Sequence, residues 1–510
     1  MKRQHRTLAT RWIRPLSLIM VGLSTLTQSS CDDLWSGSLV EDRRNCVLSP
    51  AVCGDLEECD YSTETCKPLP PPSCPAISFE SITPTSGSRR GGTKVTITGS
   101  GFQGDMRVEI DGTPLENVVL EASNQLSGTL GSSIVSCGPS AVTLISSCFE
   151  RVSKEAAFAY SLDPLEFDNQ PVTLPSPPGT QVQQVIIDEL NSDGDPDIIG
   201  IESTGVRSFF SDGNGSFTTS PPHSLGGSLF QAASADFNGD TQHDLIISDD
   251  QNPRLWFLAS SGKGTFSPLS IPMPESIRGV VSQDTSGDGV ADVLAVGRSG
   301  TLYLLLGSSG GLTGPDIVAT GLPTSSMFAS LGDTNGDGRG ELVVAGGNAQ
   351  RVEVWQQNGS KSFQRLAQVS VPAPATSVLV TEASGDGIPD LVVSLAGQKN
   401  IALIPGKGQG TFGSAISIPS GTSAQQLSAI DVNCDGYTDI VTSSASENQL
   451  GLLLGSRTGL QNGQTIDLSA HQSGIAQAVS VADVNFDGLP DLVVGSNQTP
   501  AYLLLPNISP

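Results

Sequence analysis

The sequence is poor in aromatic residues, histidines and basic residues, on which many common functions depend. Only 5% of its 510 residues are aromatic, and four are histidines. So few histidines leave little material for zinc sites or for general-base chemistry by imidazole. Basic residues are also scarce, because 26 Lys and Arg stand against 52 Asp and Glu, a formal net charge of -26. A surface this acidic repels phosphate backbones, which argues against nucleic acid as a partner.

Long apolar runs are missing as well. Beyond the first 30 residues, no stretch reaches the roughly 18 apolar residues expected of a membrane helix. Residues 1–30 hold five basic residues and no acid, and 16–26 form a short, mostly apolar run. This pattern is typical of a secretory signal peptide. We therefore expect a secreted or cell-surface protein.

Cys31 directly follows this signal. The preceding residues resemble a bacterial lipoprotein signal, although Gln28 stands where that family has an aliphatic residue. The resemblance implies lipidation of Cys31 and an outer-membrane lipoprotein that touches the membrane only through its N-terminal lipid. The alternative is ordinary signal cleavage, with Cys31 free or in a disulfide.

Nine cysteines in an exported chain favour disulfides. Four of them are spaced like a small module with two bridges: Cys46, Cys53, Cys59 and Cys66. A zinc site is the weaker interpretation of these four, because their spacing is not the zinc pattern. Cys137 and Cys148 flank a strand-like run and are candidates for a third bridge. Cys74 and Cys434 have no evident partner.

A proline-rich stretch at 67–75 predicts a stiff spacer, so 31–74 is expected to be a Cys-rich segment with that spacer. Alternating polar and apolar residues then predict an all-β sandwich. Residues 77–102 resemble an IPT/TIG domain, an immunoglobulin-like fold, through Pro84, Gly87, the glycines at 91–92 and the Gly-x-Gly-Phe at 99–102. The resemblance covers 75–161 and implies a spacer or interaction module without catalytic residues.

One acidic phrase of nine residues recurs along the rest of the chain, each time between two apolar runs. We name its copies loops 1 to 7; they are 189–197, 236–244, 284–292, 333–341, 382–390, 431–439 and 483–491. Successive copies start 47 to 52 residues apart. Repeats of this length, with four short strands each, predict a seven-bladed β-propeller over 162–510.

The strands within a repeat differ in composition. A run rich in small residues precedes the acidic loop, as in 230–235, and suits a crowded innermost strand. The last repeat ends with 502–505 and stops before a fourth strand. The segment 165–175, ahead of the first repeat, looks like that missing strand. We therefore expect it to complete the last sheet and close the ring.

This repeat region resembles the FG-GAP/VCBS repeat family, the propeller type of integrin α subunits and many bacterial surface proteins. The resemblance covers about 163–510. It implies a scaffold, and a scaffold does not by itself fix a function.

Every loop places oxygen-bearing side chains at positions 1, 3, 5 and 9, with Gly at position 6 except for Thr241. Hard cations take several oxygen ligands around a tight turn. We therefore predict Ca2+ as a structural cofactor. The predicted ligands are Glu189, Asn191, Asp193, Asp197, Asp236, Asn238, Asp240, Asp244, Asp284, Ser286, Asp288, Asp292, Asp333, Asn335, Asp337, Glu341, Glu382, Ser384, Asp386, Asp390, Asp431, Asn433, Asp435, Asp439, Asp483, Asn485, Asp487 and Asp491.

The loops allow two other interpretations. In the first, each is a solvated acidic turn whose Asp and Gly serve only the backbone. Loop 2, which lacks the glycine, and loops 3 and 5, which have the weaker Ser ligands, are the poorest cation candidates. The second is an EF-hand, which we reject because position 12 is never Glu and the following residues are strand formers.

Signals of catalysis are weak. Residues 307–311 match GxSxG and 408–413 match GxGxxG, but both join predicted strands, whereas these motifs act between a strand and a helix. His243 and His471 have no convincing nucleophile partner. The connections opposite the acidic loops are short, so we expect no catalytic residues and no enzyme.

The expected function is adhesion or ligand binding by a calcium-stabilised propeller, through the face away from the acidic loops. The partner would be an extracellular protein or glycan. The alternative is a lectin or a polysaccharide lyase on the same propeller. A lectin would repeat aromatic residues in its connections, yet Trp256 and Trp355 occupy third strands and most repeats lack an equivalent.

Overall fold

The computed structural model describes residues 57–60, 65–68, 76–104, 106–132, 138–146, 150–162, 165–324, 328–444, 446–472 and 474–509. The chain divides into two units, Met1–Cys74 and Pro75–Pro510. The predicted signal, most of the spacer, Cys31, Cys46, Cys53, Cys74, Cys137 and Cys148 lie outside the described residues. In the first unit, β1 (Glu57–Asp60) pairs antiparallel with β2 (Thr65–Pro68), and Cys59 lies opposite Cys66 in their register.

Residues 78–161 form two sheets around one apolar core. The first contains β3 (Ser78–Thr83), β5 (Lys94–Ser100), β9 (Gln125–Thr129) and β8 (Glu116–Ala122); the second contains β4 (Ser86–Ser88), β11 (Arg151–Ser161), β10 (Pro139–Ile145), β6 (Arg107–Ile110) and β7 (Thr113–Pro114). In β5 every second side chain is buried, including Val95 and Ile97. This alternation is what a sheet with one face on a core requires.

The remaining described residues form seven further sheets, numbered here by chain order. Sheet 1 has β13 (Val182–Asp188), β14 (Asp197–Glu202), β15 (Gly205–Ser211), β16 (Phe217–Thr219) and β17 (His223–Ser224); sheet 2 has β18 (Leu229–Ala235), β19 (Asp244–Asp249), β20 (Arg254–Ser260) and β21 (Phe266–Pro272); sheet 3 has β22 (Ile277–Gln283), β23 (Asp292–Gly297), β24 (Thr301–Leu306) and β25 (Thr313–Thr320); sheet 4 has β26 (Ala329–Gly332), β27 (Glu341–Ala345), β28 (Arg351–Gly359) and β29 (Ser362–Ser370).

The other three sheets follow the same plan. Sheet 5 has β30 (Ala375–Thr381), β31 (Asp390–Leu395), β32 (Asn400–Ile404) and β33 (Ile416–Pro419); sheet 6 has β34 (Ala424–Ile430), β35 (Asp439–Ser444), β36 (Gln449–Leu453) and β37 (Gln464–Asp467); sheet 7 has β38 (Ala476–Ala482), β39 (Asp491–Ser496), β40 (Tyr502–Leu505) and β12 (Val172–Leu174).

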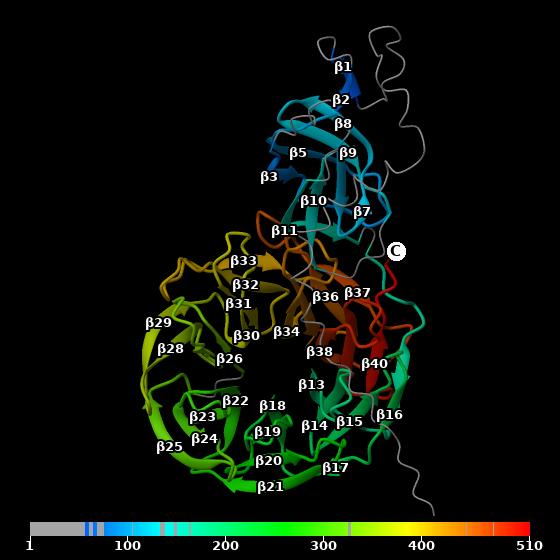
Figure 1. The fold of residues 1–510 in the computed structure, drawn as a ribbon. Helices are drawn as coiled ribbons and strands as arrows, with labels where there is room; N and C mark the ends of the chain where they lie inside the picture. The colour runs from blue at the N-terminus through cyan, green and yellow to red at the C-terminus, as the bar shows by residue number, and fades with distance from the viewer. Residues whose placement is uncertain are drawn as a thin grey trace, which may run out of the picture. The chain divides into compact units, whose positions relative to one another are not determined.

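These sheets stand around a common centre as a β-propeller (Figure 1). The first strand of each sheet contacts the first strand of the next, and β38 contacts β13, so the inner strands form a closed ring. A separate apolar cluster lies between each pair of neighbouring sheets, including the last and the first. Valine, leucine, isoleucine and alanine dominate these clusters, in a sequence of which only 5% of the residues are aromatic.

The second strands are buried on both faces, because each is flanked by neighbouring sheets. All six residues of β19, β23, β31, β35 and β39 are buried. This is why the sequence shows apolar runs directly after the acidic loops. In six of the sheets, the ladder between first and second strands contains a register shift near its start.

Buried serines tie some neighbouring sheets together at these shifts. The Ser248 hydroxyl in β19 accepts the N–H of Gln231 and donates to the carbonyl of Arg278 in sheet 3, at 2.9 Å each. The first strands also line a small central cavity of about 190 Å³. There Gln231 donates its Nε2 to the carbonyl of Ala329 at 3.0 Å, which links sheets 2 and 4.

The ring is closed by strands from distant parts of the sequence. Strand β12 pairs antiparallel with β40, with Val172 opposite Leu504 and Leu174 opposite Tyr502. The prediction that 165–175 completes the last sheet is therefore confirmed. The all-β prediction is also confirmed, because the described residues contain no α-helix. None of their elements is a helix of the length and hydropathy that a membrane span requires.

One expectation about the cysteines was wrong. Cys434, which had no evident partner in the sequence, is disulfide-bonded. It lies in loop 6 and only 3% of its surface is exposed. Sequence spacing offered no signal for this bond, because Cys434 has no cysteine near it in the chain.

Candidate metal centres

Each acidic loop connects the first and second strands of one sheet, at the same end of every sheet. Positions 4 and 6 of every loop have the left-handed backbone, with φ between +56° and +91°. The residues at position 4 are Ser192, Gly239, Gly287, Gly336, Gly385, Cys434 and Phe486, and those at position 6 are Gly194, Thr241, Gly289, Gly338, Gly387, Gly436 and Gly488. Only the turn at position 6 was predicted from the sequence. Glycine at position 4 in four loops was the signal for the second left-handed position.

The backbone of every loop donates to the loop's own acidic side chains. In all seven, Oδ1 at position 5 accepts the N–H of position 7. In six, the carboxylate at position 1 accepts the N–H of position 6. Where position 3 is Asn, its Oδ1 accepts the N–H of position 5. Part of the acidic pattern therefore serves the backbone, as the solvated-turn interpretation held.

The carboxylate at position 9 is buried in every loop, with 0 to 1% of the residue exposed. One of its oxygens accepts the N–H of position 2 in all seven loops. In six loops the other oxygen accepts an N–H from the end of the third strand, such as Gly455 for Asp439 at 2.6 Å. Position 9 therefore fastens the loop to its sheet, a role that the sequence analysis did not assign.

The acidic side chains of a loop are close enough to repel one another. Burial raises the pKa of Asp439 to about 7, and the charges of Asp435 and Asp431 add to the rise. Burial likewise raises the pKa of Asp491 to about 7, with Asp487 and Asp483 adding to it. In these two loops the charges at positions 1 and 5 therefore make the charged form of position 9 less favourable.

Loop 6 is covered by two other segments. The N–H of Leu162 donates to the carbonyl of Asn433 at 2.6 Å, and the buried Leu162 packs against Cys434 and Leu489. From the C-terminal side, Nδ2 of Asn507 donates to the carbonyl of Val432 at 3.2 Å. Asn433 is only 8% exposed as a result.

The two covering segments also bind each other. The N–H of Ile508 donates to the carbonyl of Glu166 at 2.9 Å, and the N–H of Asp168 donates to that of Pro506 at 2.8 Å. The N–H of Glu166 also donates to the Ser509 hydroxyl at 2.7 Å. We call this pair, residues 162 and 165–168 with residues 506–509, the clasp.

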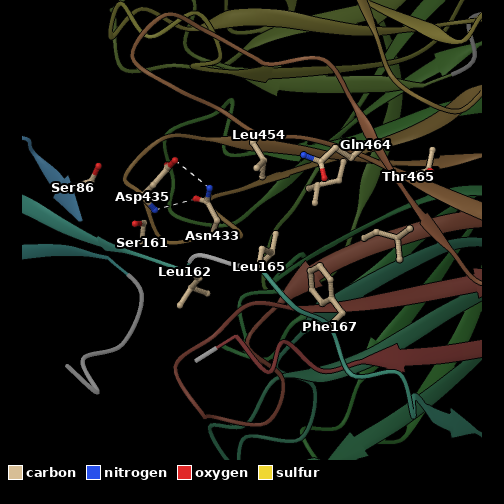
Figure 2. Close-up of a pocket in the computed structure, with 12 residues that line it drawn as sticks. Ser86, Ser161, Leu162, Leu165, Phe167, Asn433, Asp435, Leu454, Gln464 and Thr465 are labelled. Atoms are coloured by element: carbon tan, nitrogen blue, oxygen red, sulfur yellow. Dashed lines mark hydrogen bonds between the residues drawn. The ribbon is translucent and has the colours of Figure 1, made fainter. Parts of the chain in front are cut away.

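A cleft of about 670 Å³ opens beside loop 6 (Figure 2). Its lining residues are Ser86, Ser161, Leu162, Leu165, Phe167, Asn433, Asp435, Leu452, Leu454, Gln464, Thr465 and Ile466. Asn433 and Asp435 face each other at its edge, where Nδ2 of Asn433 donates to Oδ2 of Asp435 at 3.2 Å. Residues of the clasp and of loop 6 therefore line this cleft together.

Loop 3 shows the opposite situation, because Asp284, Ser286 and Asp288 are exposed. Burial would raise the pKa of Asp284, but the N–H groups of Gly289 and Gly287 outweigh it and leave the pKa lowered. In loop 4, the N–H of Arg339 similarly lowers the pKa of Asp337. The charged form of these exposed carboxylates is therefore stabilised.

The loops fit a divalent cation only if other oxygens join their acids. As they stand, no three His, Cys, Asp or Glu side chains in the described part of the chain are grouped to hold a metal ion. A cation in a loop would therefore need the Asn or Ser at position 3 and main-chain oxygens besides the acids.

One observation in loop 7 supports that fit. Within the described residues, the buried Oδ1 atom of Asp483 has no hydrogen-bond partner. Its Oδ2 accepts the N–H of Gly488 at 2.9 Å. An unpaired buried carboxylate oxygen is costly, and a cation beside it removes that cost. The donor set is all oxygen, which suits Ca2+.

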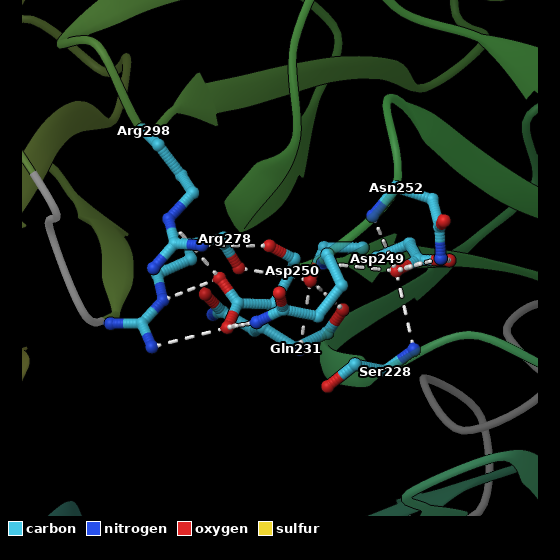
Figure 3. Close-up of polar contacts among 9 residues, drawn as sticks. Ser228, Gln231, Asp249, Asp250, Asn252, Arg278 and Arg298 are labelled. Carbon is cyan, nitrogen blue, oxygen red and sulfur yellow. Dashed lines mark hydrogen bonds and ion pairs between the residues drawn. The ribbon is translucent and has the colours of Figure 1, made fainter.

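The opposite end of the sheets carries a different kind of chemistry (Figure 3). Asp250 forms an ion pair with Arg278 of sheet 3 at 2.7 Å and lies 3.6 Å from Nε of Arg298. The Arg278 guanidinium lies over the Phe230 ring, 4.8 Å from its centre, and Phe230 contacts Phe328 with ring centres 4.9 Å apart. These contacts join sheets 2, 3 and 4 through positively charged and aromatic side chains.

Asp249, the neighbour of Asp250, is fully buried, and hydrogen bonds pair its carboxylate oxygens. It accepts hydrogen bonds from Ser228 N–H at 3.2 Å, from Asn252 and from Nε of Arg254 at 2.9 Å. These bonds leave its pKa lowered, although burial alone would raise it. The turn between β19 and β20 is therefore held rigidly, and the side chains that it presents are pre-organised.

The motifs that resembled catalytic signatures lie in strand connections. Residues 307–311 join β24 to β25, and 408–413 join β32 to β33, as expected. The structure brings together one trio that sequence reasoning missed: Nδ1 of His243 lies 2.8 Å from Asp188, which also accepts the hydroxyl of Ser234. The carboxylate stands between the other two groups, so the histidine is not placed to activate the serine.

A ring of like sheets, each with an acidic loop between its first two strands, defines a β-propeller protein built from acidic-loop repeats. A family model described as FG-GAP-like repeat matches residues 190–247, 236–295, 284–344, 333–393, 383–442 and 435–494. The chain therefore belongs to the FG-GAP-like repeat family. The model of the IPT/TIG domain matches 78–147. Both modules are typically non-catalytic, and FG-GAP-like propellers are often extracellular.

No curated protein matches the chain by sequence. Among solved structures, BBS1N in complex with ARL6DN is 10% identical, with 68% of this chain and 97% of that chain covered and a TM-score of 0.48. The Cps50 (Swd1) propeller domain of Myceliophteria thermophila is 8% identical (67% and 99% covered, TM-score 0.46). An auxiliary nutrient binding protein from Bacteroides ovatus is 12% identical (85% and 98% covered, TM-score 0.40). Likenesses of this strength carry no functional argument.

Proposed function

We propose that this protein is an exported, non-catalytic surface protein whose propeller is stabilised by Ca2+ and binds an extracellular protein or glycan. The observation that carries the proposal is the sevenfold repetition of one oxygen-rich loop with one backbone geometry. Repetition of this kind favours a shared ligand over seven independent surface turns. A lipid on Cys31 would anchor the protein to the outer membrane.

Electrostatics supports the calcium part. Each loop gathers three acids at positions 1, 5 and 9, and position 9 is buried. Burial raises the pKa of the position 9 carboxylate in loops 1, 2, 4, 6 and 7, and the charges at positions 1 and 5 raise it further, so these loops hold unfavourable negative charge that a divalent cation would neutralise. When bound, Ca2+ would supply positive charge and fix the loop side chains, with no chemical step.

The contrast between the two ends of the sheets supports the ligand-binding part. One end bears the acidic loops, whereas the other bears the arginines and phenylalanines around Asp250. Those side chains are already fixed by ion pairs and ring contacts, so binding them costs little conformational entropy. We therefore place the ligand at the end away from the acidic loops.

The calcium part is tested by thermal unfolding of the full chain with EDTA, with about 1 mM Ca2+ and with about 1 mM Mg2+. At tenfold excess over its dissociation constant, each site adds ~1.4 kcal/mol by mass action. We expect a clear rise in the unfolding midpoint with Ca2+ and a smaller one with Mg2+. Equal midpoints in EDTA and Ca2+ would refute this part.

The ligand part is tested by binding to cells, glycan arrays and acidic polysaccharides. The informative variant is Arg298→Ala, because Arg298 is the most exposed arginine around Asp250, at 40%. Arg339→Ala at position 7 of loop 4 is the matched control on the acidic end. Loss of binding in the first variant alone supports the proposal. Cleavage of a polysaccharide would replace it with the lyase alternative.

A further inference from the structure

The central cavity of about 190 Å³ has an uncharged lining, because none of its lining residues is Asp, Glu, Lys, Arg or His. The lining residues come from sheets 1, 2, 4, 5, 6 and 7. A charged molecule would lose its hydration in this cavity without meeting a partner of opposite sign. The cavity therefore suits an uncharged occupant.

Two glutamine side chains show which groups of the inner strands can be bound from the centre. The Gln184 amide accepts the N–H of Ala232 at 2.7 Å and donates to the carbonyl of Ala232 at 3.3 Å. The Gln231 amide binds the N–H and the carbonyl of Ala329 in the same way, at 3.3 Å and 3.0 Å. Both groups of these two alanines therefore point away from their second strand and toward the centre.

Three other sheets have no glutamine that binds this position. Val378, Leu427 and Val479 pair with their second strands at the register that Ala232 and Ala329 have. Their N–H and carbonyl groups therefore also point toward the centre. Their side chains pack into the apolar clusters between sheets, so the main chain is what they present to the cavity. In the described part of the chain, no side chain and no backbone of another sheet binds these groups.

Serine hydroxyls add to these main-chain groups. Four serines line the cavity from sheets 4 to 7, namely Ser330, Ser377, Ser428 and Ser480. The residues that the structure describes include no hydrogen-bond partner for these four hydroxyls. Ser377 is only 6% exposed, so its hydroxyl opens to the cavity and not to the outer surface. A buried hydroxyl without a partner is costly, and an occupant of the cavity would remove that cost.

We propose that the central cavity is a binding site for a small uncharged polyol, up to the size of one sugar. One water needs about 10–15 Å³, so a cavity of about 190 Å³ has room for a molecule of that size. Each hydroxyl of a polyol both donates and accepts, so it can bind serine hydroxyls and main-chain groups on several sheets at once. A simple amide has one donor next to one acceptor, as in Gln184, and would leave most of these groups unbound.

This site is separate from those of the proposed function. None of the cavity-lining residues is a predicted Ca2+ ligand, and none of the arginines around Asp250 is among them. Polyol binding therefore requires neither Ca2+ in the acidic loops nor a ligand at the arginine-bearing end.

The experiment is residue-level hydrogen exchange of the full chain with and without D-glucose. Without the sugar, the amides of Val378, Leu427 and Val479 should exchange faster than those of Ala232 and Ala329, which glutamines already bind. For a ligand of about a dozen non-hydrogen atoms we expect a Kd of about 1 mM. At about ten times this concentration, exchange of the first three amides should slow by up to about tenfold, and the two alanines should keep their rates.

Three variants locate the site by calorimetric titration with D-glucose. Ser377→Ala removes one hydroxyl and should weaken binding about two- to tenfold, the value of one hydrogen bond. Ser428→Leu fills part of the cavity and should abolish binding. Ser282→Ala is the matched control, because Ser282 is also in a first strand but does not line the cavity. Ser377→Ala keeps the proposal testable if Ser428→Leu fails to fold.

Several outcomes would overturn the proposal. Equal exchange with and without D-glucose would mean that the sugar does not occupy the cavity. Equal slowing at Ala232 and Ala329 would mean a general stiffening of the propeller. Equal protection by D-glucuronate would refute an uncharged ligand, and protection by acetamide but not by D-glucose would refute a polyol.

Discussion

Loops 6 and 3 have the same acidic positions, the same hydrogen bonds to position 5 and the same left-handed backbone at positions 4 and 6. They differ in how far other segments of the chain cover them. Asn433 in loop 6 is 8% exposed beneath the clasp, whereas Ser286, its counterpart in loop 3, is exposed. Burial raises the pKa of Asp431 to about 6, but the pKa of the equivalent Asp284 is lowered. The chemistry of a repeat therefore depends on its cover as well as on its own residues.

The largest expected effect comes from removing a position 9 carboxylate. Asp439→Ala leaves the buried N–H groups of Val432 and Gly455 without their acceptor. We expect the free energy of unfolding in EDTA to fall by about 3 kcal/mol. Asp284→Ala, at the exposed position 1 of loop 3, should cost about 1 kcal/mol, because water can replace the acceptor of the Gly287 and Gly289 N–H groups. Urea unfolding measures both, and equal losses would mean that burial does not distinguish the two sites.

The pH dependence should sharpen the same comparison. The pKa values of Asp439 and Asp491 are raised to about 7, so without metal they stabilise the fold when protonated. That contribution is complete below their unfolded pKa near 3.8 and is lost as the pH rises through about 7. In EDTA we expect stability to fall by on the order of 2 kcal/mol between about pH 5.5 and about pH 8.

The lowered pKa values of Asp284 and Asp337 act at another pH. Their contribution is present above about 4 and is lost only as the pH falls through the lowered pKa. Asp284→Asn should therefore leave the slope between pH 5.5 and pH 8 unchanged, whereas Asp439→Asn should reduce it. Urea unfolding at several pH values measures these slopes. A flat wild-type profile would contradict the raised values.

A smaller effect is expected at position 6 of loop 2. Thr241 has φ +71°, a conformation that strains a β-branched residue. We expect Thr241→Gly to raise the free energy of unfolding by about 0.5–1 kcal/mol, because the released strain exceeds the entropy cost of glycine. The converse change in loop 3, Gly289→Thr at φ +88°, should lower it by about 1–2 kcal/mol. Chemical denaturation in EDTA measures both, and a destabilised Thr241→Gly would show that the threonine makes a compensating contact.

The smallest effect is expected from Asp288→Asn in EDTA. Asp288 is exposed, and its Oδ1 accepts the N–H of Val290 at 3.0 Å, which an Asn oxygen also accepts. The change in stability should therefore stay within about 0.5 kcal/mol. With Ca2+ present, the same variant should lose the stabilisation contributed by one site. A large loss in EDTA would show that the charge itself supports the loop.

Local features of the fold were predictable because the same residue pattern recurs in every repeat. Apolar residues after every acidic loop indicated the buried second strands, and the incomplete last repeat pointed to 165–175 as the closing strand. The alternation around Val95 and Ile97 likewise indicated a sandwich. The hairpin register and the inter-sheet serines were not predictable, because a single Ser248 between apolar neighbours looks the same whether or not it reaches the next sheet.

The site was predictable only in part. Its acidic positions follow from the sequence, but the fastening role of position 9 needs the third-strand N–H groups, which come later in the chain. That the clasp covers loop 6 could not be predicted for a similar reason. Leu162 and Asn507 are separated from loop 6 by long stretches of sequence, and nothing in their own surroundings points to it. The disulfide of Cys434 was missed on the same grounds.

The joint between β12 and β40 also sets an order of events during folding. Its partners are more than 300 residues apart, as in the contact between Ser176 and Ala501. A nascent chain can assemble the earlier sheets one after another, but the seam stays open until the last strand arrives. During that interval the apolar surfaces that later pack around Tyr502 and Leu504 are exposed to solvent. Aggregation then competes with closure of the propeller. Cutting the chain at another turn and joining its present ends would move this waiting step to a different sheet.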